Sequence, residues 1–132
     1  MKQEKTPLLA VDIIINLNDK LVLIKRKNEP YKGEWALPGG FVKEGEIVEE
    51  AARREAREET GLKIKINKLV GVYSKPDRDP RGHIVSICFE GEKIGGELES
   101  ATDAEDVKVF KEIPWNRLAF DHNEILREAG FR

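Results

Sequence analysis

Three glutamates near the middle of the chain have the residue type and the spacing of a metal-binding site. Glu55, Glu58 and Glu59 stand at positions i, i+3 and i+4, which places their carboxylates on one face of a helix. Like charges at these spacings repel, and a sequence serving stability alone would place lysines at i+4. A hard divalent cation held by oxygen atoms removes this cost. The glutamates are therefore candidate metal ligands, and a solvated helix face is the alternative.

The helix that must carry these glutamates is predicted to begin after Gly45 and to end at Gly61. Gly61 suits the left-handed position that follows a helix, and Leu62 suits the hydrophobic contact that accompanies it. Before the helix, Pro38-Gly39-Gly40 is predicted to turn sharply, because glycine permits positive φ and a close approach to the backbone. The expected apolar stripe of the helix is rich in alanine, which favours close packing on a sheet: Ile47, Val48, Ala51, Ala52 and Ala56.

The rest of the chain predicts an α+β fold, a mixed α/β/α sandwich in which one central helix lies on a mixed sheet. Neither a G-x-G-x-x-G loop nor a G-x-x-x-x-G-K-[ST] loop is present, which argues against dinucleotide-binding and P-loop folds. Strands are predicted over 8–17, 20–27, 62–73, 84–89 and 107–110, with a turn at Asn18-Asp19, a hairpin or excursion over 91–100, and short C-terminal helices over 114–118 and 123–129.

Length and composition narrow the functional classes. The 132 residues predict a single domain, 1–132, and a formal net charge of −2 gives no support to a nucleic-acid surface. No stretch has the length of a membrane span, and the polar start lacks the apolar region of a secretory signal. The single cysteine, Cys88, cannot form an intramolecular disulfide and is expected to be a buried apolar residue. These features predict a cytoplasmic protein.

The stretch from Gly40 to Leu62 resembles the Nudix box, G-x5-E-x7-R-E-U-x-E-E-x-G-U. Gly40 is followed after five residues by Glu46, and after seven more by Arg54-Glu55-Ala56-Arg57-Glu58-Glu59-Thr60-Gly61-Leu62. Every fixed letter matches, and Ala56 is smaller than the aliphatic residue usual at its position. Seven fixed letters over 23 positions form a highly specific pattern.

This resemblance implies the Nudix fold and a metal-dependent enzyme that cleaves a nucleoside diphosphate linked to another group. It implies that Glu55, Glu58 and Glu59 bind Mg²⁺ or Mn²⁺, and that the carbonyl of Gly39 adds a ligand. It also implies that Arg54 orients a carboxylate by ion pairing and that Glu46 supports the box. Glu58, Glu59 and Arg54 are accordingly candidate catalytic residues.

Two further segments are similar to the Nudix subgroup associated with ADP-ribose pyrophosphatase activity. They are residues 73–82 and 118–122, and Pro76, fifteen residues after Gly61, matches a proline that marks this subgroup, with Pro80 as the other candidate. Arg78 and Arg81 are either phosphate-binding residues or ordinary loop residues, since arginine suits bidentate phosphate binding. Asp121 and His122 are candidate pocket residues, although Asp121 also suits the N-cap of the last helix.

The resemblance suggests hydrolysis of ADP-ribose to AMP and ribose 5-phosphate. The alternatives are another nucleotide substrate, such as an oxidised nucleoside triphosphate, a dinucleoside polyphosphate or a nucleotide sugar, and a module that senses ADP-ribose without cleaving it. The general base is expected from a carboxylate after the central strands, either Asp103 or Glu105, with Glu99 as a fallback. Similar proteins are commonly homodimers, so a homodimer is a further expectation.

Overall fold

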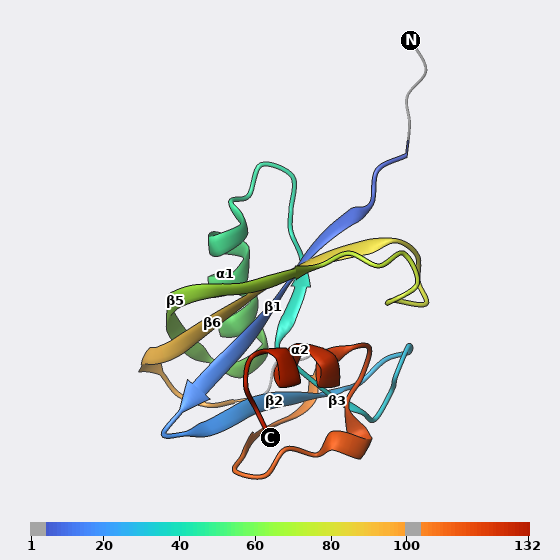
Figure 1. The fold of residues 1–132 in the computed structure, drawn as a ribbon. Helices are drawn as coiled ribbons and strands as arrows, with labels where there is room; N and C mark the ends of the chain where they lie inside the picture. The colour runs from blue at the N-terminus through green and yellow to red at the C-terminus, as the bar shows by residue number, and fades with distance from the viewer. Residues whose placement is uncertain (1–4, 100–103) are drawn as a thin grey trace.

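A mixed β-sheet carries a long helix on one face and a short helix on the other (Figure 1). The computed structural model describes residues 5–99 and 104–132, apart from the side chains of Ala104 and Glu105. The elements are β1 (Leu8–Leu17), β2 (Lys20–Arg26), β3 (Trp35–Ala36), β4 (Gly39–Phe41), α1 (Val48–Thr60), β5 (Leu62–Tyr73), β6 (Ile84–Gly96), β7 (Ala104–Phe110), the 3-10 helix η1 (Trp115–Arg117) and α2 (His122–Glu128).

Strand β1 is the centre of the sheet. It pairs in parallel with β6, from Leu8 opposite Ile84 to Asn16 opposite Glu92. It pairs antiparallel with β2 and β4, while β5 lies antiparallel beside β6, and β3 and β7 lie antiparallel beside β2. The sheet is therefore mixed, and the predicted α+β fold is confirmed.

The two faces of the sheet have different partners because successive strand residues point to opposite sides. Val11, Ile13 and Ile15 of β1 pack with the three buried alanines of α1, whose small side chains let the helix lie close to the sheet. Ile14 packs on the other face with Ile125 and Leu126 of α2. By the same alternation, the buried Asp12 lies on the α2 face, which is where the candidate site forms.

Several local predictions hold in the structure. Asn18 and Asp19 have positive φ values of 52° and 62°, which two-residue hairpin turns of type I′ require. Gly61 follows α1 with φ 79°, and its amide donates to the carbonyl of Arg57. Strand β5 begins with alternating buried and exposed residues, as the sequence between Leu62 and Lys65 predicts.

Other local predictions were wrong. Ile47 is 65% exposed, because it stands in extended conformation just before α1 and outside its apolar stripe. The expected hairpin over 91–100 is absent from its described part, since β6 continues to Gly96 along β5. Gly91 serves close strand packing there, as a Cβ atom would lie 2.8 Å from the carbonyl oxygen of Lys65. Gly39 and Gly40 form strand β4 and lack positive φ, although both meet neighbouring groups closely.

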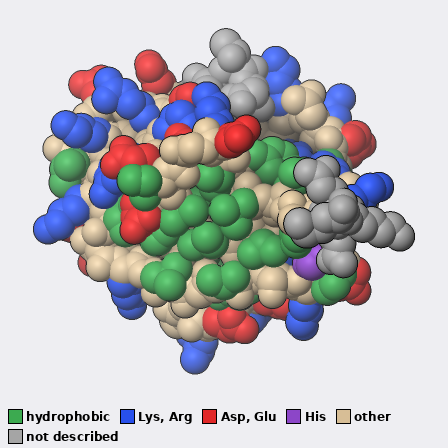
Figure 2. Space-filling view, turned by 90° about the horizontal axis from the view of Figure 1, so that it is seen from above, with side chains coloured by type: hydrophobic (Ala, Val, Ile, Leu, Met, Phe, Trp, Pro, Cys, Tyr) green, Lys and Arg blue, Asp and Glu red, His purple; other side chains and the backbone are tan. Residues whose placement is uncertain are grey.

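Hydrophobic side chains gather on the face seen from above in Figure 1, and charged side chains surround them (Figure 2). Among the exposed large hydrophobic residues are Leu69 and Val72 on β5, an outer strand in the described sheet order. Contiguous apolar surface of this kind marks contact sites in many proteins. No helix in the described part of the chain is long and apolar enough to cross a membrane.

The turn at Gly61 yields a first prediction. Gly61 and Gly45 have nearly the same φ, 79° and 80°, but a Cβ atom at Gly61 would collide with the carbonyl oxygen of Glu97, whereas one at Gly45 meets nothing within 4 Å. Both alanine variants carry left-handed strain of about 1–2 kcal/mol. We expect Gly61→Ala to lower the free energy of unfolding by at least about 1 kcal/mol more than Gly45→Ala, measured by urea denaturation. Equal losses would contradict the close packing of Gly61.

Candidate active site

A cavity of about 280 Å³ opens between β1, β4, the middle of α1 and the loop that joins β5 to β6. The segment just before α2 closes one side of it. Its lining combines carboxylates, arginines and aromatic rings, which is the chemistry that a nucleotide substrate needs. The polar and aromatic residues of the lining are Asp12, Arg26, Phe41, Glu55, Glu59, Arg78, Asp79, Arg81, Phe120 and His122.

One end of the cavity is formed by helix α1 and strand β4. Glu55 and Glu59 reach it from successive turns of the helix, beside Gly39 and Gly40. The amide of Gly39 donates to Oε2 of Glu59 at 3.3 Å. A Cβ atom at Gly40 would lie 2.6 Å from the carboxyl carbon of Glu55, so only glycine leaves room for that carboxylate. The glycine pair therefore allows the strand and the acidic face of the helix to meet.

Arg54 joins the glutamates at this end. Its guanidinium donates to Glu46 (2.8 Å and 3.0 Å), to Glu55 (2.6 Å), to Glu58 (3.2 Å) and to the carbonyl of Phe41 (3.0 Å). Hydrogen bonds from Arg54, and one from the amide of Lys43, lower the pKa of Glu46 to about 2. The bonds to Glu46 likewise raise the pKa of Arg54. Arg54 and Glu46 thus connect α1 to the loop before it, as the sequence resemblance implies.

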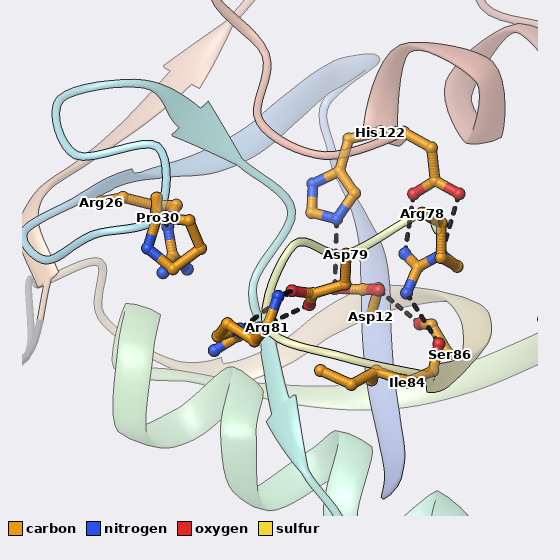
Figure 3. Close-up of polar contacts among 10 residues, drawn as sticks. Asp12, Arg26, Pro30, Arg78, Asp79, Arg81, Ile84, Ser86 and His122 are labelled. Carbon is orange, nitrogen blue, oxygen red and sulfur yellow. Dashed lines mark hydrogen bonds and ion pairs between the residues drawn. The ribbon is translucent and has the colours of Figure 1, made fainter. Parts of the chain in front are cut away.

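Figure 3 shows a second polar group in the cavity lining, around Arg78 and His122. Arg78 is only 5% exposed, and it donates two hydrogen bonds to Asp121, at 2.7 Å and 2.9 Å, and one to the carbonyl of Ile84 at 3.3 Å. Burial is the largest single effect on the pKa of Arg78 and lowers it, but the hydrogen bonds to Asp121 and the charges of Asp121, Asp12 and Asp79 together raise it. Asp121 stands at the N-cap position of α2, as the sequence suggests, but its carboxylate pairs with Arg78 and makes no cap hydrogen bond.

His122 connects the start of α2 to the segment before β4. The amide of Leu37 donates to its Nδ1 atom at 3.0 Å, which leaves the hydrogen on Nε2. Nε2 lies 3.5 Å from Oδ1 of Asp12, whose other oxygen accepts a hydrogen bond from Ser86. Burial lowers the pKa of His122, although Asp12 opposes this effect. The ring is therefore a neutral link between three segments.

Arg26 and Arg81 bring two positive charges to the cavity. The Nε atom of Arg26 donates to the carbonyl of Pro30 at 2.7 Å, and both arginines lie against the ring of Phe120, at 4.9 Å and 5.4 Å from its centroid. Arg81 also pairs with the buried Asp79 at 2.8 Å. Burial lowers the pKa of Arg26, and the charge of Arg81 adds to this effect. Two guanidiniums this close favour the binding of an anion.

The structure brings most of the predicted site residues together. Gly39, Glu55, Glu59, Arg78, Arg81 and His122 line the cavity. Glu58 is 55% exposed and turned to Arg54, and Pro76 is exposed on the loop between β5 and β6. Asp103 lies outside the described residues, and of Glu105 only the backbone in β7 is described. The amide of Glu99 donates to the carbonyl of Thr60, at the C-terminal end of α1.

Sequence reasoning did not single out Arg26, Asp12, Phe41 or Phe120. The sequence did carry a signal for Arg26. Its strand is apolar on both faces and then ends in cations, and cations at the end of a buried strand lie where the neighbouring strands no longer cover them. Trp35 is buried in the core and makes an edge contact with Phe110 at 4.8 Å. The phenylalanine rings in the cavity lining are those of Phe41 and Phe120.

The donor set fits a divalent cation in its chemistry. Carboxylate oxygens of Glu55 and Glu59, with backbone oxygens of the adjacent strand, are the ligands that Mg²⁺ and Mn²⁺ prefer. In the described residues, no three His, Cys, Asp or Glu side chains already stand as a cage for a metal. Glu58 is held by Arg54 instead, so a three-glutamate site requires its side chain to turn.

Comparisons with known proteins agree with this geometry. The NUDIX domain family matches residues 6–129. An ADP-ribose pyrophosphatase of Methanocaldococcus jannaschii is 55% identical over 122 residues, which are 92% of this chain and 72% of that protein. The chain therefore belongs to the Nudix family, and it is a Nudix hydrolase that resembles the ADP-ribose pyrophosphatases.

Two solved structures share the fold. A bifunctional NMN adenylyltransferase/ADP ribose pyrophosphatase from Francisella tularensis, complexed with AMP and a Mn ion, matches with a TM-score of 0.84 and 30% identity over 96% of this chain and 42% of that chain. The NUDIX domain of Shewanella oneidensis NrtR, complexed with ADP ribose, matches with a TM-score of 0.79 and 28% identity over 96% of this chain and 88% of that chain. Enzymes of this family use divalent metal ions.

The pair of Glu46 and Arg54 predicts a pH-dependent stability. Because the pKa of Glu46 is lowered to about 2 in the folded chain, its stabilising effect is complete above the ordinary glutamate pKa of about 4.3 and is lost as the pH falls toward 2. We expect Glu46→Gln to lower the free energy of unfolding at pH 7, with a difference from the wild type that shrinks below pH ~4. Urea denaturation at several pH values measures this. The exposed Glu112→Gln is the control, and a pH-independent difference would refute the assignment.

The buried position of Arg78 gives another prediction. Arg78→Ala leaves the half-buried Asp121 without its bidentate partner, so we expect a loss of about 2–3 kcal/mol in the free energy of unfolding. Arg53→Ala, whose partner Glu50 is 62% exposed, is expected to cost less than about 1 kcal/mol. Thermal unfolding followed by circular dichroism distinguishes the two. Equal stability of both variants would show that Arg78 serves ligand binding rather than structure.

Proposed function

We propose that this Nudix hydrolase cleaves ADP-ribose to AMP and ribose 5-phosphate, with Mg²⁺ or Mn²⁺ as its cation. The observation that carries the proposal is the single cavity in which Glu55 and Glu59 face Arg26, Arg81 and an aromatic ring. A diphosphate requires both the cation and the arginines, and a nucleoside requires the ring. The likeness to the Methanocaldococcus jannaschii enzyme over 92% of the chain supports this choice of substrate.

Each residue has a proposed role. Glu55, Glu58 and Glu59, with the carbonyl of Gly39, hold the cation, which when bound neutralises phosphate charge and helps a water molecule to deprotonate. Arg54 orients Glu55 and Glu58 through its hydrogen bonds to both.

The arginines and the base complete the assignment. Arg26 and Arg81 bind the diphosphate oxygens, a role supported by their position in the lining of the cavity that Glu59 also lines. Arg78, Asp121 and His122 shape the substrate side of the cavity through their contacts with each other, Ile84 and Leu37. Pro76 contributes by shaping the loop that carries Arg78 and Arg81. Asp103 or Glu105 is the proposed general base.

Other nucleotides are the second candidate class, and a substrate panel separates them. The panel contains ADP-ribose, an oxidised deoxyguanosine triphosphate, a dinucleoside polyphosphate and a nucleotide sugar, each assayed with Mg²⁺ by chromatography of the products. ADP-ribose is expected to give the highest kcat/KM, with AMP and ribose 5-phosphate as products. Equal or faster turnover of the triphosphate would overturn the choice of substrate, and tight binding of ADP-ribose without release of AMP would indicate a sensor.

The glutamate assignment predicts the effect of one substitution. Glu59→Gln removes a charged oxygen ligand without changing side-chain size, so we expect kcat for AMP release to fall at least about a hundredfold while the thermal unfolding temperature stays near that of the wild type. Glu112→Gln, which is exposed and distant from the cavity lining, is the matched control. A rate close to that of the wild type would refute a cation at Glu59.

A homodimer is also proposed, on the basis of the sequence resemblance. The apolar side chains exposed on β5 support it, because an outer strand with Leu69 and Val72 at its surface offers an area for a second copy. The cytoplasmic location stays a prediction.

A further inference from the structure

We propose that Asp12 selects the base of the substrate, by accepting a hydrogen bond from the exocyclic amino group of an adenine that stacks on Phe120. This inference rests on the proposed function for its substrate, and it assigns a specificity-determining role to a residue outside the Nudix box. Both residues line the same cavity as the glutamates.

The surroundings of Asp12 hold its carboxylate at the floor of the cavity. Asp12 is 8% exposed, and polar groups face it from two sides: the hydroxyl of Ser86 donates a hydrogen bond to Oδ2, and the Nε2 atom of His122 lies 3.5 Å from Oδ1. These two polar groups come from β6 and α2, so the carboxylate is fixed between the sheet and the helix (Figure 3). A carboxylate has about four acceptor positions, which leaves acceptor capacity for a ligand.

This chemistry determines which group of a ligand can face Asp12. A carboxylate offers acceptors alone, so a carbonyl oxygen or a phosphate placed against it is repelled, whereas an amino group is bound. Asp79, also buried and lining the cavity, adds negative charge on the same side. The position that faces Asp12 therefore suits an uncharged donor group of the ligand and not one of its phosphates.

The aromatic wall above Asp12 suits a flat ring. The guanidinium of Arg81 lies 5.2 Å from the ring centroid of Phe41 and 5.4 Å from that of Phe120. A guanidinium is planar, and it stacks on aromatic faces as a purine does. Because the Arg81 side chain is partly exposed, it can move aside, so a purine can take its place on these rings.

The backbone at this wall is strained. Phe120 has φ 52° and Tyr31 has φ 60°, and their rings are 4.8 Å apart. Large side chains rarely adopt left-handed φ values, and residues that do so gather at binding and active sites. Holding Phe120 in this conformation costs free energy. A role of its ring in binding a ligand inside the cavity explains why the fold keeps this conformation.

Two ligands that differ at one group test the proposal without turnover. AMP and purine riboside 5′-monophosphate share the phosphate, ribose and ring system, but the second lacks the amino group. With Mg²⁺ present, we expect the wild-type protein to bind AMP about tenfold to a hundredfold more tightly, measured by isothermal titration calorimetry, because the analogue leaves a buried acceptor unpaired. Equal affinities, or no measurable binding of AMP, would overturn the proposal.

Substitutions locate the effect. In Asp12→Asn one of the two carboxylate oxygens, which face Ser86 and His122 respectively, is replaced by an NH₂ group, and the negative charge is lost. The side chain then offers the ligand less acceptor capacity, so we expect the preference for AMP to disappear. Asp77→Asn, on the exposed loop, is the control and should keep the preference. Phe120→Leu should weaken both ligands alike. A preference that survives in a folded Asp12→Asn protein overturns the role of Asp12, and unchanged binding in Phe120→Leu overturns stacking. If Asp12→Asn fails to fold, the comparison of the two ligands on the wild type still decides.

The same data separate this proposal from the proposed function. A preference for AMP in a protein that releases no AMP from ADP-ribose would leave the base site standing and would reject the hydrolysis of that substrate. Rapid release of AMP from ADP-ribose, together with equal binding of the two ligands, would support the proposed hydrolysis and would reject the base site at Asp12.

Discussion

The site depends on the contact of one guanidinium with three carboxylates. Arg54 donates to Glu46, Glu55 and Glu58, and it also reaches the carbonyl of Phe41 at the end of β4. Without this cation, the acidic face of α1 would repel itself and the adjoining loop. Arg54 therefore fixes the helix against β4, and Gly40 of that strand leaves space for the carboxylate of Glu55, which the guanidinium binds.

Strand β1 serves the core and the cavity at once. Val11 and Ile13 pack beneath α1, while Asp12 between them points to the opposite face, toward Ser86 and His122. A one-residue shift of register would exchange these roles and place a carboxylate among the alanines of the helix. The parallel pairing of β1 with β6 prevents such a shift over its whole length, so the position of Asp12 is as well determined as the core itself.

Much of the fold could be predicted from local sequence signals, whereas only part of the site could be predicted in this way. The β1–β2 turn, the end of α1 at Gly61 and the acidic face of the helix depend on neighbouring residues, which the sequence displays directly. The pairing of Arg78 with Asp121, 43 residues later, and the close approach of Gly39 to Asp12 depend on how distant segments meet. No local pattern distinguishes an arginine that binds a phosphate from one that binds a buried aspartate.

The parallel pairing of β1 and β6 has a consequence for how the chain folds. Asp12 and Ser86 are separated by 74 residues, whereas α1 and the β1–β2 hairpin contain contacts between near neighbours in sequence. Closing so long a loop costs chain entropy before any contact compensates for it, and topologies dominated by such contacts fold slowly. Local elements can therefore form early and independently, while the floor of the cavity exists only after β1 and β6 have paired. Recognition of the base is accordingly a property of the completed sheet, and a partly folded chain with its acidic helix formed would still lack it.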